Sequence, residues 1–246
     1  MSARPAPGGR GLVASALAAA ADWLIEPAEP AAPQGSSAAP DARPVVAVVG
    51  LSARCGSTTV ARALGAELAA RDPGSACAVT SARAPGAVPL GLPAAARLTR
   101  TLSPLAGAGT RLCGRLFLFD THDRAGLAEA ARYLAPLILD VEDTSEASGA
   151  AALADHVLLI GSPATEPALA TVIAESLRRV GPDPVVVLNR PAGEVERWDG
   201  RVAMTLPESR VGAQLALAGR EPRGRLGRAI AELADRCEEG AAGRNA

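Results

Sequence analysis

Short apolar runs rich in β-branched residues alternate along the chain with segments whose apolar residues recur every three or four positions. The first apolar run covers residues 44–50 (PVVAVVG), and after a small polar stretch Val60, Leu64 and Leu68 follow at helical spacing. A short apolar run predicts a buried strand, and the longer spacing predicts one face of a helix. The repeated alternation predicts an α/β fold, with a doubly wound, mainly parallel sheet of about seven strands flanked by helices in three layers.

The same reading places the remaining elements. Further strands are expected at 76–80, 116–120, 137–140, 156–160, 184–188 and 202–205, and helices at 124–134, 145–154, 167–180, 211–217 and 225–237. Residues 81–114 are rich in Pro and Gly, and a short helix at 92–102 is the only element expected there. Side chains that follow parallel strands gather at one edge of a sheet, so candidate chemistry is sought at the strand ends.

The N-terminal region has a different pattern. Leu12, Val13, Leu17, Trp23 and Leu24 lie near one face at helical spacing, and a stretch rich in Pro, Ala and Ser follows them. We therefore expect an amphipathic helix within residues 1–25, a flexible linker at 26–43, the α/β domain at 44–237 and a disordered tail at 238–246. A helix tethered in this way either docks on its own domain or recruits another protein.

Composition narrows the classes of function. The 246 residues include 25 arginines and no lysine, and the net charge of −1 gives no overall attraction to nucleic acid or to an anionic membrane. No stretch reaches the roughly 18 apolar residues that span a bilayer. The four cysteines show no C-x-x-C spacing, so neither a zinc site nor a disulfide framework is indicated. These features favour a cytoplasmic protein without a transmembrane segment.

The polar stretch between the first strand and the first helix has the order of a phosphate-binding loop. Residues 51–59 read LSARCGSTT, against a pattern of Gly, four residues and Gly-Lys-[Ser/Thr]. Counting back from Gly56 places Leu51 at the first glycine, Ser57 at the lysine and Thr58 at the hydroxyl that binds magnesium. Strand, tight loop and helix N-terminus together form an anion cradle, but here the cradle lacks its charged side chain.

This segment resembles the deviant P-loop of the MinD/ParA-type ATPases, members of the SIMIBI class, which carry a second lysine just after the first glycine. That position is Ser52 here, so serines replace both lysines. The resemblance extends over residues 44–233 through the segments ADHVLLIGSP (154–163), PVVVLNR (184–190) and LPESR (206–210). It implies that Asn189 occupies the place of the asparagine that reads adenine, and that Pro207 belongs to the turn that follows the last strand.

The resemblance supplies a set of candidate site residues and cofactors. ATP and Mg²⁺ are the expected cofactors if the site is retained. The expected nucleotide-binding residues are Ser52, Arg54, Cys55, Gly56, Ser57, Thr58, Thr59, Asn189 and Pro207, and the expected metal ligands are Thr58 and Asp140. A hydrogen bond to a charged group contributes roughly 1.5–3 kcal/mol, so losing both lysines weakens phosphate binding by about 100-fold to several thousand-fold.

Two aspartates compete for the position of the carboxylate beside the loop. Asp120 and Asp140 both end apolar strands, and Asp140 fits the order of the family better because one short helix separates it from the strand at 156–160. The expected strand at 76–80 is followed by Ser81, Ala82 and Arg83, so no acid stands where active members place an aspartate.

These features predict a degenerate MinD/ParA-like protein that does not hydrolyse ATP efficiently and acts as a positioning or assembly factor through protein contacts. A protein partner bound through residues 11–25, a homodimer and recruitment to the membrane by a partner are consistent with this prediction. One alternative is a slow ATPase in which Arg54 or an arginine of a partner replaces the lysine. Another is a DNA-associated regulator that uses Arg220, Arg223, Arg225 and Arg228, but acidic neighbours make nucleic acid the less expected partner.

Overall fold

The computed structural model describes residues 42–71, 76–80, 101–105, 110–121, 123–191 and 193–242. The helix predicted within residues 1–25 and the linker at 26–43, apart from its last two residues, lie outside these ranges. The helix predicted at 92–102 also lies outside them, except for Thr101 and Leu102, which are helical. Within the described ranges, no helix combines the length and the apolar character needed to cross a membrane.

The described part of the chain forms one eight-stranded sheet in the order β3-β4-β2-β5-β1-β6-β7-β8. The strands are β1 (Val45–Gly50), β2 (Cys77–Val79), β3 (Arg111–Cys113), β4 (Leu116–Leu118), β5 (Leu137–Val141), β6 (His156–Gly161), β7 (Val185–Asn189) and β8 (Met204–Leu206). All neighbours pair in parallel except β3 and β4, which are antiparallel. The predicted doubly wound α/β fold is confirmed, and β3 is an additional edge strand too short to leave a periodic signal.

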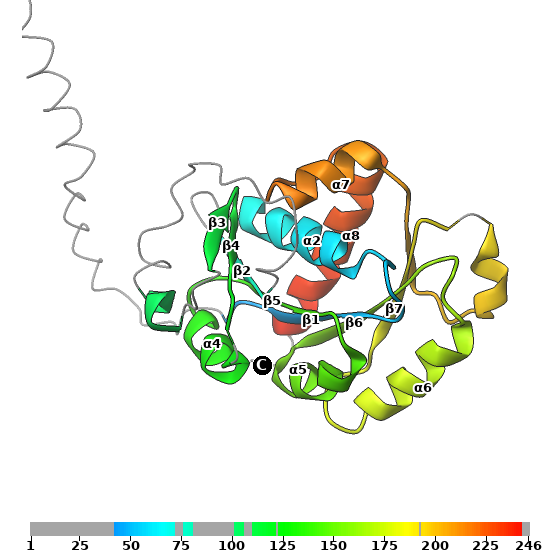
Figure 1. Cartoon of the computed structure of the whole chain (residues 1–246), viewed down its shortest axis with the longest axis horizontal. Coiled ribbons are helices and arrows are strands. Elements are labelled where there is room, and N and C mark those ends of the chain that lie inside the picture. The colour runs from blue at the N-terminus through cyan, green and yellow to red at the C-terminus, as the bar shows by residue number, and fades with distance from the viewer. Residues whose placement is uncertain are drawn as a thin grey trace, which may run out of the picture. The chain divides into compact units, whose positions relative to one another are not determined.

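Helices cover both faces of the sheet, as Figure 1 shows. The helices are α2 (Ser57–Arg71), α4 (Arg124–Ala131), α5 (Ala147–Leu153), α6 (Pro167–Leu177), α7 (Arg210–Leu217) and α8 (Gly224–Ala242), with short 3-10 turns η1 (Ser103–Leu105), η2 (Thr144–Glu146) and η3 (Glu194–Trp198). Helices α2, α7 and α8 lie on one face, and α4, α5 and α6 lie on the other. Helix α8 continues past Cys237 to Ala242, so the prediction of a disordered tail from residue 238 is wrong for residues 238–242.

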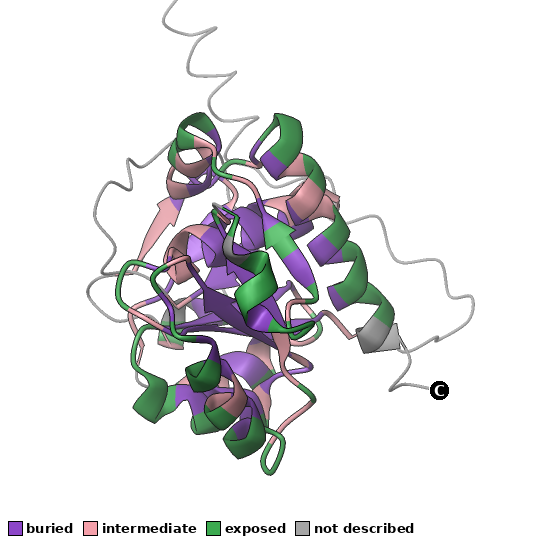
Figure 2. Cartoon of the chain, turned by 90° about the vertical axis from the view of Figure 1, so that its right-hand side faces the viewer, coloured by how far each residue is buried: buried purple, intermediate pink, exposed green. Residues whose placement is uncertain are grey.

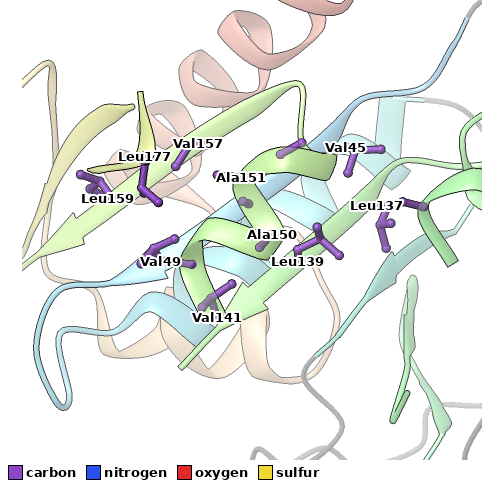
Figure 3. Close-up of a cluster of buried hydrophobic side chains, with 14 of the residues drawn as sticks. Val45, Val49, Leu137, Leu139, Val141, Ala150, Ala151, Val157, Leu159 and Leu177 are labelled. Carbon is purple, nitrogen blue, oxygen red and sulfur yellow. The ribbon is translucent and has the colours of Figure 1, made fainter. Parts of the chain in front are cut away.

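The core consists of two apolar layers that share the central strand. Successive residues of β1 point to opposite faces, so Val46 and Val48 pack with Leu64 of α2, whereas Val45 and Val49 pack in the other layer. Figure 3 shows the second layer, where Ala150 and Ala151 of α5 and Leu177 of α6 lie over the sheet. Figure 2 shows buried strands between helices whose outer faces are exposed. A strand covered on both faces is apolar throughout, which explains the run at 44–50.

The position of β1 within this sheet determines where candidate chemistry gathers. Strand β1 pairs with β5 on one side and with β6 on the other. At its amino end, the Val45 N–H donates a hydrogen bond of 2.9 Å to the Asp155 carboxylate. At its carboxyl end, the segments that follow β1, β5, β6 and β7 converge at one edge of the parallel sheet.

Candidate functional site

The loop between β1 and α2 is a tight turn anchored by its backbone. The Leu51 N–H donates to the Ile160 carbonyl at 3.0 Å, and the Cys55 N–H donates to the Ser52 carbonyl at 3.2 Å. The Leu51 side chain is buried in the layer shared with α5 and α6. The position that corresponds to the first glycine of a P-loop is therefore part of the apolar core.

Gly56 and Asn189 meet at the end of this loop. The Asn189 side chain is buried at the carboxyl end of β7, and its Nδ2 atom donates a hydrogen bond of 2.8 Å to the Cys55 carbonyl. Gly56 has φ 91°, and a Cβ atom there would lie 2.3 Å from the Asn189 Nδ2 atom. Only glycine allows this backbone conformation and this close approach. The contact brings together two predicted site residues that are distant in sequence.

Ser52 is hydrogen-bonded to Thr165, a residue that was not among the predicted site residues. Its Oγ atom lies 2.6 Å from Thr165 Oγ1, and the Ser162 N–H donates to the same Thr165 oxygen at 2.9 Å. Ser162 and Thr165 follow β6 and are buried. The Ser52 hydroxyl therefore ties the loop to the β6–α6 connection. The sequence does carry a signal for this contact, because two small hydroxyl residues, Ser162 and Thr165, follow β6, the strand that pairs with β1.

Ser57, the first residue of α2, lies over the end of β1. A Cβ atom added at Gly50 would be 2.8 Å from Ser57 Oγ and 3.2 Å from Cys55 Sγ. The absence of a side chain at Gly50 is therefore what makes room for Ser57. The position predicted to correspond to the P-loop lysine therefore carries a short, uncharged side chain directed back toward the strand.

Asp140 lies beside this loop, since it pairs with Val48 in the register between β5 and β1. Its side chain is 3% exposed, and neither carboxylate oxygen has a hydrogen-bond partner of ordinary geometry among the described residues. Burial raises the pKa of Asp140 to about 7, against a smaller lowering by the nearby Thr58 hydroxyl. The Asp140 N–H donates to Thr80 Oγ1 at 2.9 Å, which fixes the strand end.

The alternative aspartate lies farther from the loop. Asp120 follows β4, and both β2 and β5 separate β4 from β1. The Asp120 N–H donates a hydrogen bond of 3.2 Å to Oγ1 of Thr110, the residue that directly precedes β3. Of the two aspartates, Asp140 is the one that the sheet order brings next to the loop.

Arg62 is a buried charge that sequence reasoning missed. It lies on the inner face of α2 with 0% exposure, and its Nη1 atom donates to the Leu217 carbonyl at 3.2 Å. Burial lowers its pKa, and its positive charge opposes the rise in the pKa of Asp140. Helical periodicity places position 62 on an apolar face, but it gives no indication that an arginine there is retained as a buried cation.

Thr58 and Asp140, the two residues predicted as metal ligands, lie close enough for the Thr58 hydroxyl to act on the Asp140 carboxylate. No group of three His, Cys, Asp or Glu side chains in the described ranges is close enough to hold a metal ion. Mg²⁺ is commonly held by one or two carboxylates, phosphate oxygens and water, so a hydroxyl beside a buried carboxylate would suit the protein's share of such a site. A magnesium ion bound there would neutralise phosphate charge.

A cavity of about 370 Å³ opens beside the loop, between α2, the end of β7 and helices α7 and α8. Its interior is apolar and is formed mainly by Val60, Ala63, Leu226 and Ile230. Of the predicted site residues, Arg54, Gly56, Thr59, Asn189 and Pro207 line it. Ser52, Cys55, Ser57, Thr58 and Asp140 do not line it, and we refer to Ser52, Ser57, Thr58 and Asp140 as the loop centre.

Exposed arginines form the rim of this cavity. Arg54, Arg190 and Arg210 line it together with Glu208, and all four side chains are exposed. Arg54 has φ 60° and Arg190 has φ 55°, a left-handed conformation that is uncommon outside glycine. The Arg190 Nη2 atom donates to the Arg54 carbonyl at 2.8 Å, which links the two residues across the rim. Arg190 and Arg210 were not among the predicted site residues, whereas Arg54 was.

No protein-family model and no curated protein matches the sequence. Among solved structures, the chain is similar to the septum site-determining protein MinD of Pyrococcus horikoshii OT3 complexed with Mg-ADP, with 15% identity and a TM-score of 0.57 over 83% of this chain and 99% of that one. It is also similar to a chain of the MinC:MinD cell division complex of Aquifex aeolicus, with 15% identity and a TM-score of 0.55 over 80% and 96%.

A third similar structure is a ParA family ATPase from Chlorobium tepidum TLS, with 15% identity and a TM-score of 0.53 over 79% of this chain and 98% of that one. At this level of identity the similarity shows the fold. It confirms the fold that the sequence resemblance predicted.

Proposed function

From the MinD/ParA-type P-loop fold of this chain, we propose that the protein does not hydrolyse ATP efficiently and acts through protein contacts, as a positioning or assembly factor. One observation carries the proposal: the loop centre contains no cationic side chain. Serines occupy both lysine positions, and Ser52 is already bonded to Thr165 at 2.6 Å. Stabilising charge that develops on a transferring phosphoryl group requires cations held in place for it.

The surroundings of Asp140 support the same proposal. Burial raises the pKa of this carboxyl to about 7, and a protonated carboxyl is a weaker magnesium ligand than a carboxylate. Thr80, the residue after β2, uses its hydroxyl to accept the Asp140 N–H. Thr80 lies at the end of the second strand, next to the positions where the resemblance places the aspartate that positions water in active ATPases.

Protein contacts are the remaining route to function. One similar structure is a MinC:MinD complex, which is a precedent on this fold for a protein partner. We place the contact of this chain in residues 11–25, with a homodimer and recruitment to the membrane by a partner as further parts of the proposal. The cell compartment that fits it is the cytoplasm.

The deletion of residues 1–40 tests that contact. The expected result is loss of co-purification with the partner and a change in melting temperature below about 4 °C, the scale of roughly 1 kcal/mol for a domain of this size. Differential scanning calorimetry and pull-down of the full chain and the shortened chain give both values. A larger fall in melting temperature with partner binding retained would contradict the recruitment proposal.

Steady-state phosphate release from ATP and Mg²⁺ tests the absence of hydrolysis. The full chain should release phosphate at the rate of a protein-free blank, since no cation in the loop centre offsets the charge of the transferring group. Thr58→Ala and Asp140→Asn should then have no effect. Turnover above the blank that either substitution abolishes would overturn the proposal, because it would place catalysis at the loop centre.

A further inference from the structure

We propose that two copies of this chain form a dimer in which their α6 helices pack antiparallel about a two-fold axis at Val172. Glu175 of each copy then lies over an arginine-lined hollow beside α6 of the other copy. The inference rests on the proposed function for the homodimer, and it names the surface of that dimer. It requires neither a nucleotide nor residues 11–25.

The outer face of α6 has an uncharged centre. Its exposed side chains are Ala168, Leu169, Val172, Glu175 and Ser176, and Glu175 is the only charged residue of the helix. Leu169 is 37% exposed and Val172 is 61% exposed, and the two are neighbours on one face. Within residues 225–239 of α8, by contrast, every exposed side chain is charged. An exposed apolar patch bordered by polar side chains is typical of a protein contact surface.

Helical periodicity makes this face of α6 complementary to itself. Val172 is the middle residue of the helix, and Ala168 and Ser176 lie one turn before it and one turn after it. Two such helices that pack antiparallel about Val172 have small side chains on both sides of the central contact, so their axes approach closely. A two-fold interface buries the same patch on both copies, and α6 offers such a patch.

A hollow of about 590 Å³ opens along one flank of this face, where α6 lies at the edge of its layer beside α5 (Figure 1). Helix α6 contributes Ala168 and Val172 to its lining, and the segment after β7 contributes Arg197 and Arg201. Glu166 Oε2, at the start of α6, lies 3.7 Å from Arg197 Nη2. Arg201 adds a second positive charge, so the lining holds one positive charge in excess.

The partner's Glu175 is the side chain that faces this hollow. Residues seven apart lie on the same flank of a helix, so Glu175 and Ala168 share a flank. In the antiparallel pair the partner's Glu175 therefore lies beside Ala168, and its carboxylate meets Arg197 and Arg201. Opposite charges at the rim of an interface fix its register and its partner. The match of α6 to its own surroundings, made twice by symmetry, identifies a second copy as the occupant.

Thiol cross-linking of the full chain tests the position of the axis. The four native cysteines are buried. Val172→Cys adds an exposed thiol on the axis, and oxidation by copper phenanthroline in air should give a covalent dimer, since a disulfide needs Cα atoms within about 7 Å. Val211→Cys, at an exposed valine of α7, is the matched control and should stay monomeric under the same conditions.

Sedimentation equilibrium of charge variants tests the register. The native full chain should show a concentration-dependent equilibrium between monomer and dimer. Glu175→Arg and Arg201→Glu should each raise the dimer dissociation constant about tenfold or more, because two symmetry-related contacts become repulsive. The double variant Glu175→Arg/Arg201→Glu should return to within about threefold of the native value. Glu129→Arg, at an exposed glutamate of α4, is the matched control and should have no effect. Circular dichroism melting confirms that each variant is folded.

Three results would overturn the inference. They are a full chain that stays monomeric at every concentration, equal cross-linking of Val172→Cys and Val211→Cys, or a double variant that associates no better than Glu175→Arg. A dimer that is lost on deletion of residues 1–40 and is insensitive to Glu175→Arg refutes the α6 surface and leaves the proposed function intact. Phosphate release from ATP that Thr58→Ala abolishes refutes the proposed function while the α6 dimer is unaffected.

Discussion

The loop centre and the cavity beside it differ in charge although they share the same loop. Four residues of the loop centre, Ser52, Ser57, Thr58 and Asp140, offer hydroxyls and one buried carboxylate with a raised pKa. The cavity rim instead carries Arg54, Arg190 and Arg210. The chain has the strand, loop and helix order of the MinD/ParA-type fold, and the exposed arginines near this loop line the neighbouring cavity.

This difference has a physical consequence for what each region binds. A hydroxyl of the loop centre, such as that of Ser52, already has a partner within the chain, so a phosphate there would have to replace an internal hydrogen bond. The arginines of the rim are exposed and lie outside the loop centre, so their charge does not offset this loss.

The largest expected effect is on stability and concerns Asp140→Asn. Folding raises the pKa of this carboxyl from 3.8 to about 7, so between these values the folded state holds a proton that the unfolded chain releases. The free energy of unfolding of the native protein therefore falls as pH rises from about 4 to 7, by up to about 4 kcal/mol at 1.36 kcal/mol per pKa unit.

The asparagine variant lacks this loss and should be more stable than the native protein at pH 8, with little difference at pH 4. Urea denaturation at both pH values measures it. Asp120→Asn, at a half-buried side chain beyond β4, removes a carboxylate outside the loop centre and is the matched control. A variant that is less stable than the native protein at pH 8 would mean that the positive charge of Arg62 outweighs the effect of burial on the Asp140 carboxylate and would contradict the raised pKa.

A second substitution, Gly56→Ala, changes the residue that lies between the loop centre and the cavity. Gly56→Ala requires φ near 91° for alanine and places Cβ at 2.3 Å from Asn189 Nδ2. Left-handed backbone and loss of the Asn189–Cys55 hydrogen bond together cost about 2–4 kcal/mol. Chemical denaturation should show this loss, and Gly149→Ala, at a helical glycine with open space around it, is the control. An unchanged midpoint would contradict the described contact.

A third substitution asks whether charge alone is missing from the loop centre. Ser57→Lys should raise ATP affinity about tenfold or more, on the scale of 1.5–3 kcal/mol for a charged hydrogen bond. Ser57→Met has nearly the same length without the charge and should give no gain. Calorimetric titration of ATP with Mg²⁺ compares the two variants. Equal behaviour of lysine and methionine would mean that the cradle is closed rather than uncharged.

Much of the fold could be predicted because it rests on periodicity. Buried strands such as β1 and β6 are continuous apolar runs, and α2 repeats its apolar residues at helical spacing. Strand β3 could not be predicted because three residues within a Pro- and Gly-rich segment give no period. The extent of α8 was underestimated because its last turns carry acidic residues instead of an apolar pattern.

The candidate site was predictable only where a motif exists. The loop at 51–59 and Asn189 follow from the family pattern, and the structure brings Gly56 and Asn189 together. Thr165 and Arg62 were missed because their roles arise from strand order and burial, which no local pattern encodes. The arginine rim joins α7, the end of β7 and the loop, and sequence alone does not reveal that these meet.

The most direct test of the uncharged loop centre is phosphorus-31 NMR of ATP mixed with the full chain, compared with ATP alone. Each of the three phosphates of ATP gives a separate phosphorus-31 resonance. If the loop centre holds no phosphate, the β- and γ-phosphate resonances should stay as they are without protein. A shift or broadening of the γ-phosphate resonance would contradict this account.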